Sequence, residues 1–167
     1  SPTGMVSRIE RIDFANDSAS ILSRGPLIAV AYSMAATGNS NFGYFGGGFP
    51  GPVSTVDRID YSNDTATASP KGPLSVARTA LTATGNQDFG YFAGGSPSTK
   101  STVDRIDYSN DTATAVAKGP LSESRYYFAA TGNDSFGYFG GGHPGTLSTV
   151  DRIDYSNDTA TASTKGP

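Results

Sequence analysis

The sequence predicts an all-β fold made of one four-stranded antiparallel unit that recurs every 47 residues. Three blocks keep this spacing without insertion or deletion: TGN starts at 37, 84 and 131, FGYF at 42, 89 and 136, and ERID or DRID at 10, 57, 104 and 151. Thr, Val, Ile, Tyr and Phe dominate the runs between turn residues, which is typical of strands. Gly and Pro recur too often for a helix.

Each repeat divides into four short runs, which we expect to be strands A to D in chain order. In the second whole repeat, strand A is expected in SVARTALTATG, strand B in FGYFAGG, strand C in STVDRIDYS, and strand D after the SND turn. Strand B places Phe42 and Tyr44 on one face and Phe45 on the other, so both faces of the sheet should be covered. Four strands in a repeat of this length are typical of a β-propeller blade.

The repeat boundaries divide the chain into one half blade and three whole blades of a single partial propeller domain. The half blade, residues 1–26, holds strands C and D only; the whole blades are residues 27–73, 74–120 and 121–167. A closed ring needs about four to eight blades. We therefore expect a segment of a longer repeat protein, or one subunit of a ring that other chains complete. The alternative is an elongated open stack of repeats.

Two features of the repeat resemble the kelch family of β-propellers. The glycine pairs that end strand B, at 47–48, 94–95 and 141–142, match the kelch double glycine, and Arg78 and Arg125 match the arginine that introduces its first strand. Ala31 replaces that arginine in the first whole blade, and the usual strand D tryptophan is absent. The wording DRIDYSNDTATA…KGPLS…ATGN..FGYFGGG is also similar to tandem repeats of virion-associated proteins of marine cyanobacterial phages.

Composition limits the possible partners. The formal net charge is −3 and the basic residues are scattered singly, which disfavours a nucleic-acid groove. No apolar run approaches the roughly 18–20 residues of a membrane span. We therefore expect no nucleic acid and no membrane span. The expected partners are other protein chains or further blades that complete the ring, with a host surface glycan or virion proteins as further candidates.

The sequence predicts no enzyme, no metal site and no cofactor. His143 is the single histidine and lies in a turn, and cysteine is absent. The absence of cysteine also disfavours a galactose-oxidase-type copper site, which some kelch-like propellers carry. Asp57 and Asp60 recur identically in every blade, whereas acid–base catalysis needs two different carboxyl environments. A repeated structural Asp–Arg network is expected instead, with these members: Asp57, Arg58, Asp60, Asp104, Arg105, Asp107, Asp151, Arg152 and Asp154.

The copies differ mainly at two places, the loop between strands B and C and the entry to strand A. These loops read FPGPV, SPSTK and HPGTL, and in an antiparallel blade they emerge on the same rim as the strand A entries. Recognition usually lies on loops of a rigid scaffold, and aromatic and Arg side chains often anchor interfaces. The expected contact residues are Phe49, Lys100, His143, Arg78, Arg125, Tyr126 and Tyr127. Random drift at loop tips remains the alternative.

We therefore expect a non-catalytic structural or adhesion propeller. The phage resemblance implies a place in a tail or surface appendage, so the expected location is the virion or the extracellular space. A secreted or surface carbohydrate-binding propeller of the lectin type is the alternative function.

Overall fold

The computed structural model describes residues 6–166, and these residues form an all-β structure. A two-stranded sheet contains β1 (Ile9–Arg11) and β2 (Leu22–Arg24). Sheet 1 contains β3 (Ala35–Gly38), β4 (Phe42–Gly46), β5 (Val56–Asp60) and β6 (Ser69–Lys71). Sheet 2 contains β7 (Thr82–Gly85), β8 (Phe89–Ala93), β9 (Val103–Asp107) and β10 (Val116–Ala117). Sheet 3 contains β11 (Ala129–Gly132), β12 (Phe136–Gly140), β13 (Val150–Asp154) and β14 (Ser163–Thr164).

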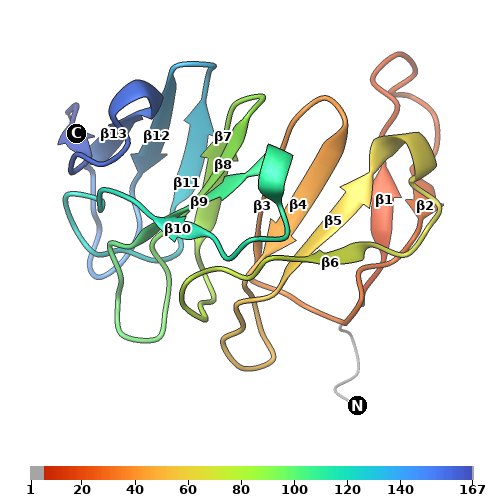
Figure 1. The fold of residues 1–167 in the computed structure, drawn as a ribbon, viewed down its shortest axis with the longest axis horizontal. Coiled ribbons are helices and arrows are strands. Elements are labelled where there is room, and N and C mark those ends of the chain that lie inside the picture. The colour runs from red at the N-terminus through yellow and green to blue at the C-terminus, as the bar shows by residue number, and fades with distance from the viewer. Residues whose placement is uncertain (1–5, 167) are drawn as a thin grey trace.

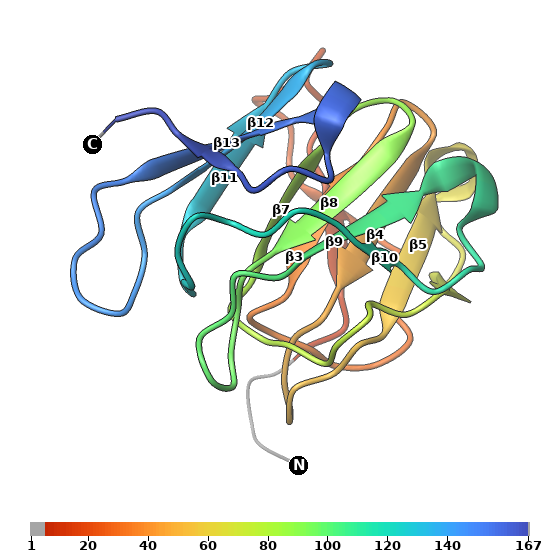
Figure 2. The same cartoon turned by 60° about the vertical axis from the view of Figure 1, so that its left-hand side comes forward.

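Within each four-stranded sheet, sequential strands are antiparallel neighbours, and the register is the same in all three sheets. Tyr44 faces Arg58 in sheet 1, and the corresponding pairs in sheets 2 and 3 are Tyr91 with Arg105 and Tyr138 with Arg152. The sheets follow one another across the molecule in chain order (Figure 1). The first strands β3, β7 and β11 are neighbours, so successive sheets lie side by side through these strands (Figure 2).

Aromatic and aliphatic side chains fill the layers between successive sheets. Between sheets 1 and 2 the core contains Tyr44, Val56, Phe92 and Ile106. Tyr44 stacks on Tyr108 of the next sheet with ring centroids 4.6 Å apart, and Tyr91 and Tyr155 repeat this stack between sheets 2 and 3. Stacked aromatic pairs contribute beyond their buried area, which favours one relative placement of neighbouring sheets.

Strand A is shorter than the sequence predicts. In the second repeat only Thr82–Gly85 joins the sheet, whereas the preceding segment is a loop held by isolated bridges such as Thr79–Ser96. Ala80 has φ +56°, a left-handed conformation that interrupts an extended strand, and Ser33 and Tyr127 repeat it at 54° and 51°. The amides of Ala80 and Tyr127 donate to the carbonyls of Ser33 and Ala80, so these bends also link the sheets.

A short 3₁₀ helix follows the third strand of each four-stranded sheet: η1 (Tyr61–Asn63), η2 (Tyr108–Asn110) and η3 (Tyr155–Asn157). The preceding aspartate caps each helix. Asp60 accepts bonds from the backbone amide and the hydroxyl of Ser62, at 2.9 and 2.6 Å. The hydroxyl bond lowers the pKa of Asp60, and the serines that follow Asp107 and Asp154 do the same for those residues. This cap fixes the conformation of the turn that, in each sheet, contacts the sheet before it in the chain.

Glycine is required where the chain leaves one sheet for the next. A Cβ on Gly72 would overlap the backbone carbonyl of Ala113 in the adjacent turn, and Gly25 and Gly119 meet Ala66 and Ala160 in the same way. The Gly72 amide donates to the Asp111 carbonyl at 2.8 Å. The contact is between two backbones, so no side-chain rearrangement can make room for a methyl group.

We expect Gly72→Ala to lower the free energy of unfolding by about 1–3 kcal/mol, the usual cost of an overpacked site. Gly140→Ala is the matched control, because a Cβ there meets only Val150, at 3.4 Å, and sheet 2 naturally carries Ala93 at that position. Urea unfolding of both variants measures the difference. Equal stabilities would show that the close approach at Gly72 is not required.

Candidate functional site

One aspartate from each helical turn binds donors of the preceding sheet. Asp111, in the turn of sheet 2, accepts from the Tyr44 hydroxyl at 2.9 Å and from the Arg58 guanidinium at 2.7 Å. Lys71 places its Nζ 3.1 Å from the second carboxylate oxygen. The three donors come from β4, β5 and β6, so one carboxylate holds three strands of sheet 1. We call this arrangement the aspartate clamp.

The clamp recurs along the chain. Asp158 in sheet 3 accepts from Tyr91 at 3.0 Å and Arg105 at 2.8 Å, and it lies 3.2 Å from Lys118. Asp64 in sheet 1 pairs with Arg11 and Arg24 of the two-stranded sheet, at 2.8 and 3.0 Å. The spacing and direction are constant, since donors always precede their aspartate in the chain.

Hydrogen bonds and neighbouring positive charges determine the protonation state of Asp111 in the clamp. Burial alone would raise the pKa of Asp111, but the bonds from Tyr44 and Lys71 and the charge of Arg58 outweigh it and lower that pKa. Burial raises the pKa of the Tyr44 phenol, and its bond to Asp111 acts in the same direction. Asp111 is therefore ionised and Tyr44 is a neutral donor, which is the arrangement that a charge-assisted hydrogen bond requires.

The structure contains Asp–Arg pairs, but within residues 6–166 none of them joins two members of the expected set of nine. Arg58 pairs with Asp111 of the next sheet, while Asp60 caps η1. Arg105 follows the same rule with Asp158, and Asp107 and Asp154 are caps. Arg152 lies over the Phe136 ring at 4.4 Å. Arg58 and Arg105 thus join neighbouring sheets through aspartates that the expected set of residues did not include.

A second charged cluster lies inside each of sheets 2 and 3. The Arg78 guanidinium is fully buried, 2.7 Å from the Asp104 carboxylate, and it donates to the Gly94 and Thr102 carbonyls at 2.8 and 3.0 Å. Ser75 also bonds Asp104 through its amide and hydroxyl. Burial lowers the pKa of Arg78, and the charge of Asp104 opposes that shift. The cluster ties the strand A entry to the base of the loop between β8 and β9.

Arg125 repeats this role in sheet 3. It is fully buried, lies 3.4 Å from Asp151, and donates to the Gly141 and Thr149 carbonyls. The expectation that Arg78 and Arg125 belong to an exposed contact face is therefore corrected. Both side chains lie beneath the loops, and their terminal guanidinium nitrogens donate to protein acceptors.

The other expected contact residues lie around the loops between the second and third strands. Tyr32 forms an isolated bridge with Phe49, and their rings are 5.1 Å apart. Tyr126 bridges His143 with ring centroids 5.5 Å apart. Tyr127 is 63% exposed and its ring lies 5.3 Å from that of Tyr126. Sheet 3 therefore presents an aromatic group of Tyr126, Tyr127 and His143.

Lys100 stands apart from that aromatic group. It is half-buried in the loop of sheet 2, where its amide donates to the Gly95 carbonyl at 3.1 Å. The same backbone hydrogen bond closes all three loops, because the amides of Val53, Lys100 and Leu147 donate to the carbonyls of Gly48, Gly95 and Gly142 at 3.3, 3.1 and 3.3 Å. The variable side chains are therefore carried on a common scaffold.

The sequence pattern places Asp111 only in the SND turn before strand D, and it does not predict the clamp. A signal was available, because every repeat carries an arginine in the third strand and a lysine or arginine before each GP, as at Arg24, Lys71, Lys118 and Lys165. These cations need acceptors, and the turn aspartate is one of three acidic residues that recur with them, beside the two aspartates of the third strand.

The described residues, 6–166, contain no cluster of three or more His, Cys, Asp or Glu side chains placed to hold a metal ion. Over the same range, no helix is long and apolar enough to cross a membrane. No protein-family model matches the chain, and a search of curated proteins finds no match.

We expect Asp111→Asn to lower the free energy of unfolding at pH 7 by about 1–3 kcal/mol, because two cations lose their shared anion. The pKa of Asp111 is lowered in the folded protein, so its contribution is complete above the unfolded value of about 3.9 and is lost as the pH falls through the folded value. The gap between wild type and variant should therefore narrow below about pH 4.

Urea unfolding at a series of pH values measures this gap. Asp17→Asn is the matched control, because Asp17 is the counterpart of Asp111 in the two-stranded sheet and is exposed. That variant should change stability by less than about 0.5 kcal/mol. A gap for Asp111→Asn that is independent of pH would contradict the ionised clamp.

Proposed function

We propose that the chain is part of a non-catalytic β-propeller that serves as a structural and recognition module. The observation that carries this proposal is the open donor set on sheet 3. Tyr138, Arg152 and Lys165 occupy the positions of Tyr44, Arg58 and Lys71, yet within residues 6–166 neither cation forms an ion pair. In this proposal the set receives the aspartate of a further blade, supplied by the same polypeptide or by another chain.

The two-stranded sheet carries the aspartate position of the clamp, which would receive the donors of a preceding blade. Asp17 is exposed at the clamp position. A cavity between this sheet and sheet 1 is lined by Ile9, Phe14, Phe45 and Ile59 among others, and the Phe14 side chain is 90% exposed. Strands A and B of a further blade would cover these apolar side chains and pair with the free edge of β1. These features support a ring with additional blades rather than an open stack.

The recognition role is assigned to the loop face, which carries Phe49, Lys100, His143, Tyr126 and Tyr127. The sheets beneath it are nearly identical, so the differences between copies are concentrated where a partner can be distinguished. The resemblance of the repeat to virion-associated phage proteins supports a place in a tail or surface appendage. There the module would contact a neighbouring virion protein or the host surface.

A carbohydrate-binding propeller of the lectin type is the second candidate. The group of Tyr126, Tyr127 and His143 favours it, since the exposed rings of Tyr127 and His143, packed on the half-buried Tyr126, provide stacking faces with polar edges for sugars. The two candidates share the same face and differ in the ligand.

We expect an antibody against this chain to label purified particles of the phage whose genome encodes it, at the tail or an appendage. A glycan array probed with the chain tests the lectin candidate. Replacing HPGTL of sheet 3 with SPSTK of sheet 2 is the variant for both assays, because the same backbone already carries that sequence. Absence of the chain from particles, with no glycan bound, would contradict both candidates.

A further inference from the structure

Sheet 1 lacks the arginine that fills the interior of sheets 2 and 3. Ala31 stands at the position of Arg78 and Arg125, and Ile28 replaces the serine that bonds the aspartate in the other sheets. The aspartate itself is retained as Asp57. Its carboxylate accepts a single hydrogen bond within residues 6–166, from the Ile28 amide at 3.1 Å. In sheet 2 the corresponding Asp104 accepts from Arg78 and twice from Ser75.

The other acceptors of the missing guanidinium are also retained. Arg78 donates to the carbonyls of Gly94 and Thr102, whose counterparts in sheet 1 are Gly47 and Thr55. The Gly47 amide bonds the Thr55 carbonyl at 3.1 Å, as Gly94 bonds Thr102 at 2.9 Å, so the backbone around the site keeps its form. The first sheet therefore holds a carboxylate and two carbonyl positions arranged for a guanidinium that its own sequence does not supply.

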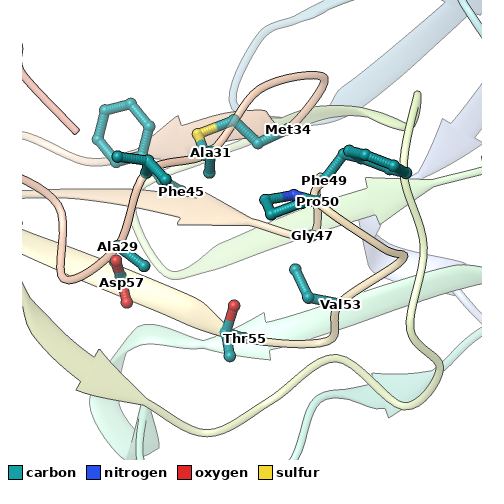
Figure 3. Close-up of a pocket in the computed structure, with 11 residues that line it drawn as sticks. Ala29, Ala31, Met34, Phe45, Gly47, Phe49, Pro50, Val53, Thr55 and Asp57 are labelled. Atoms are coloured by element: carbon teal, nitrogen blue, oxygen red, sulfur yellow. The ribbon is translucent and has the colours of Figure 1, made fainter. Parts of the chain in front are cut away.

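A cavity of about 290 Å³ occupies this place. Ala31, Met34 and Phe45 lie on one side, Val53 and Thr55 on the other, with Asp57 at one end (Figure 3). Among the described residues, 6–166, no lysine, arginine or histidine lines it, and Asp57 is the only charged one that does. Burial raises the pKa of Asp57, with the Ile28 bond acting against that shift. A carboxylate in such surroundings is stabilised by a bound cation.

We propose that this cavity is a binding site for an alkylguanidinium group, and that its occupant is an arginine side chain of a partner protein. Asp57 and the carbonyls of Gly47 and Thr55 take the planar guanidinium as their counterparts take Arg78. The apolar wall of Met34, Phe45 and Val53 accommodates the alkyl stem.

The position of the cavity favours a protein side chain over a free small molecule. It opens between the loop that contains Phe49 and Pro50 and the segment that enters β3, on the face assigned above to recognition. Two exposed apolar side chains, Val30 and Phe49, line it. An arginine in a pocket with an apolar rim is a common anchor of protein interfaces. The identity of the partner rests on the proposed function, whereas the cation site itself does not.

The direct test is a titration of the isotope-labelled chain with N-ethylguanidinium, followed by amide chemical shifts at Asp57, Thr55 and the loop around Phe49. Ethylurea, its neutral analogue, and potassium chloride at equal ionic strength are the controls. We expect saturable shifts with the cation alone. Asp57→Asn should weaken binding at least about tenfold, and Ala31→Arg should abolish it by filling the cavity. Binding of ethylurea with equal affinity, or undiminished binding to Ala31→Arg, would overturn the site.

Arg78→Ala provides an internal replica of the site in sheet 2. The variant should have a lower thermal midpoint than the wild type, and N-ethylguanidinium at millimolar concentration should restore part of that loss. If the variant does not fold, the titration of the wild type decides.

A Gly-Arg-Gly peptide compared with Gly-citrulline-Gly and free arginine identifies the source of the cation. Tighter binding of the arginyl peptide supports the partner side chain, and tighter binding of free arginine overturns that assignment. Absence of any cation binding would overturn this inference while leaving the proposed structural role untouched.

Discussion

The arrangement of the sheets depends on one carboxylate shared between a helical turn and the sheet that precedes it. Asp111 gathers a phenol, a guanidinium and an ammonium from three strands, within 2.7–3.1 Å. Each donor comes from a different strand, so the clamp fixes both the distance and the tilt of the neighbouring sheet. The tyrosine stack beside it and the glycine beneath it exclude other placements. Repetition of the same residues every 47 positions then yields the same geometry at both junctions between four-stranded sheets.

Positions in the repeat are of two kinds, those that are nearly the same in all copies and those that differ between copies. Residues that face a neighbouring sheet are nearly invariant among the copies, because each must fit the turn of the next copy. Residues on the loops between the second and third strands differ, because the buried Arg78 and Arg125 clusters support those loops from within. Sheet 1 keeps the acceptors of that cluster and omits the cation. A small change in a structural site thus leaves a cavity where a partner can insert a side chain.

Much of the fold can be predicted from the sequence, because local residue patterns indicate the strands and turns and recur every 47 residues. The clamp could not be predicted in the same way. Arg58 lies two residues from Asp60 on one strand face, and only the packing of adjacent sheets shows that its partner is Asp111. The burial of Arg78 could not be predicted from the sequence either. An arginine before a strand suggests an exposed side chain, whereas this one is buried against Asp104 and against carbonyls that are distant in the chain. The replacement of the arginine by Ala31 can be seen in the sequence. Only the structure shows that it leaves a cavity beside Asp57.

A double-mutant cycle between Arg58 and Asp111 tests the shared carboxylate most directly. Arg58→Gln, Asp111→Asn and the double variant are unfolded in urea, and Arg58 with Asp60 serves as the reference pair within one strand. A coupling energy of about 1–3 kcal/mol between Arg58 and Asp111, well above that of the reference pair, is the predicted result. Additivity within about 0.5 kcal/mol for Arg58 and Asp111 would contradict the clamp as the determinant of sheet packing.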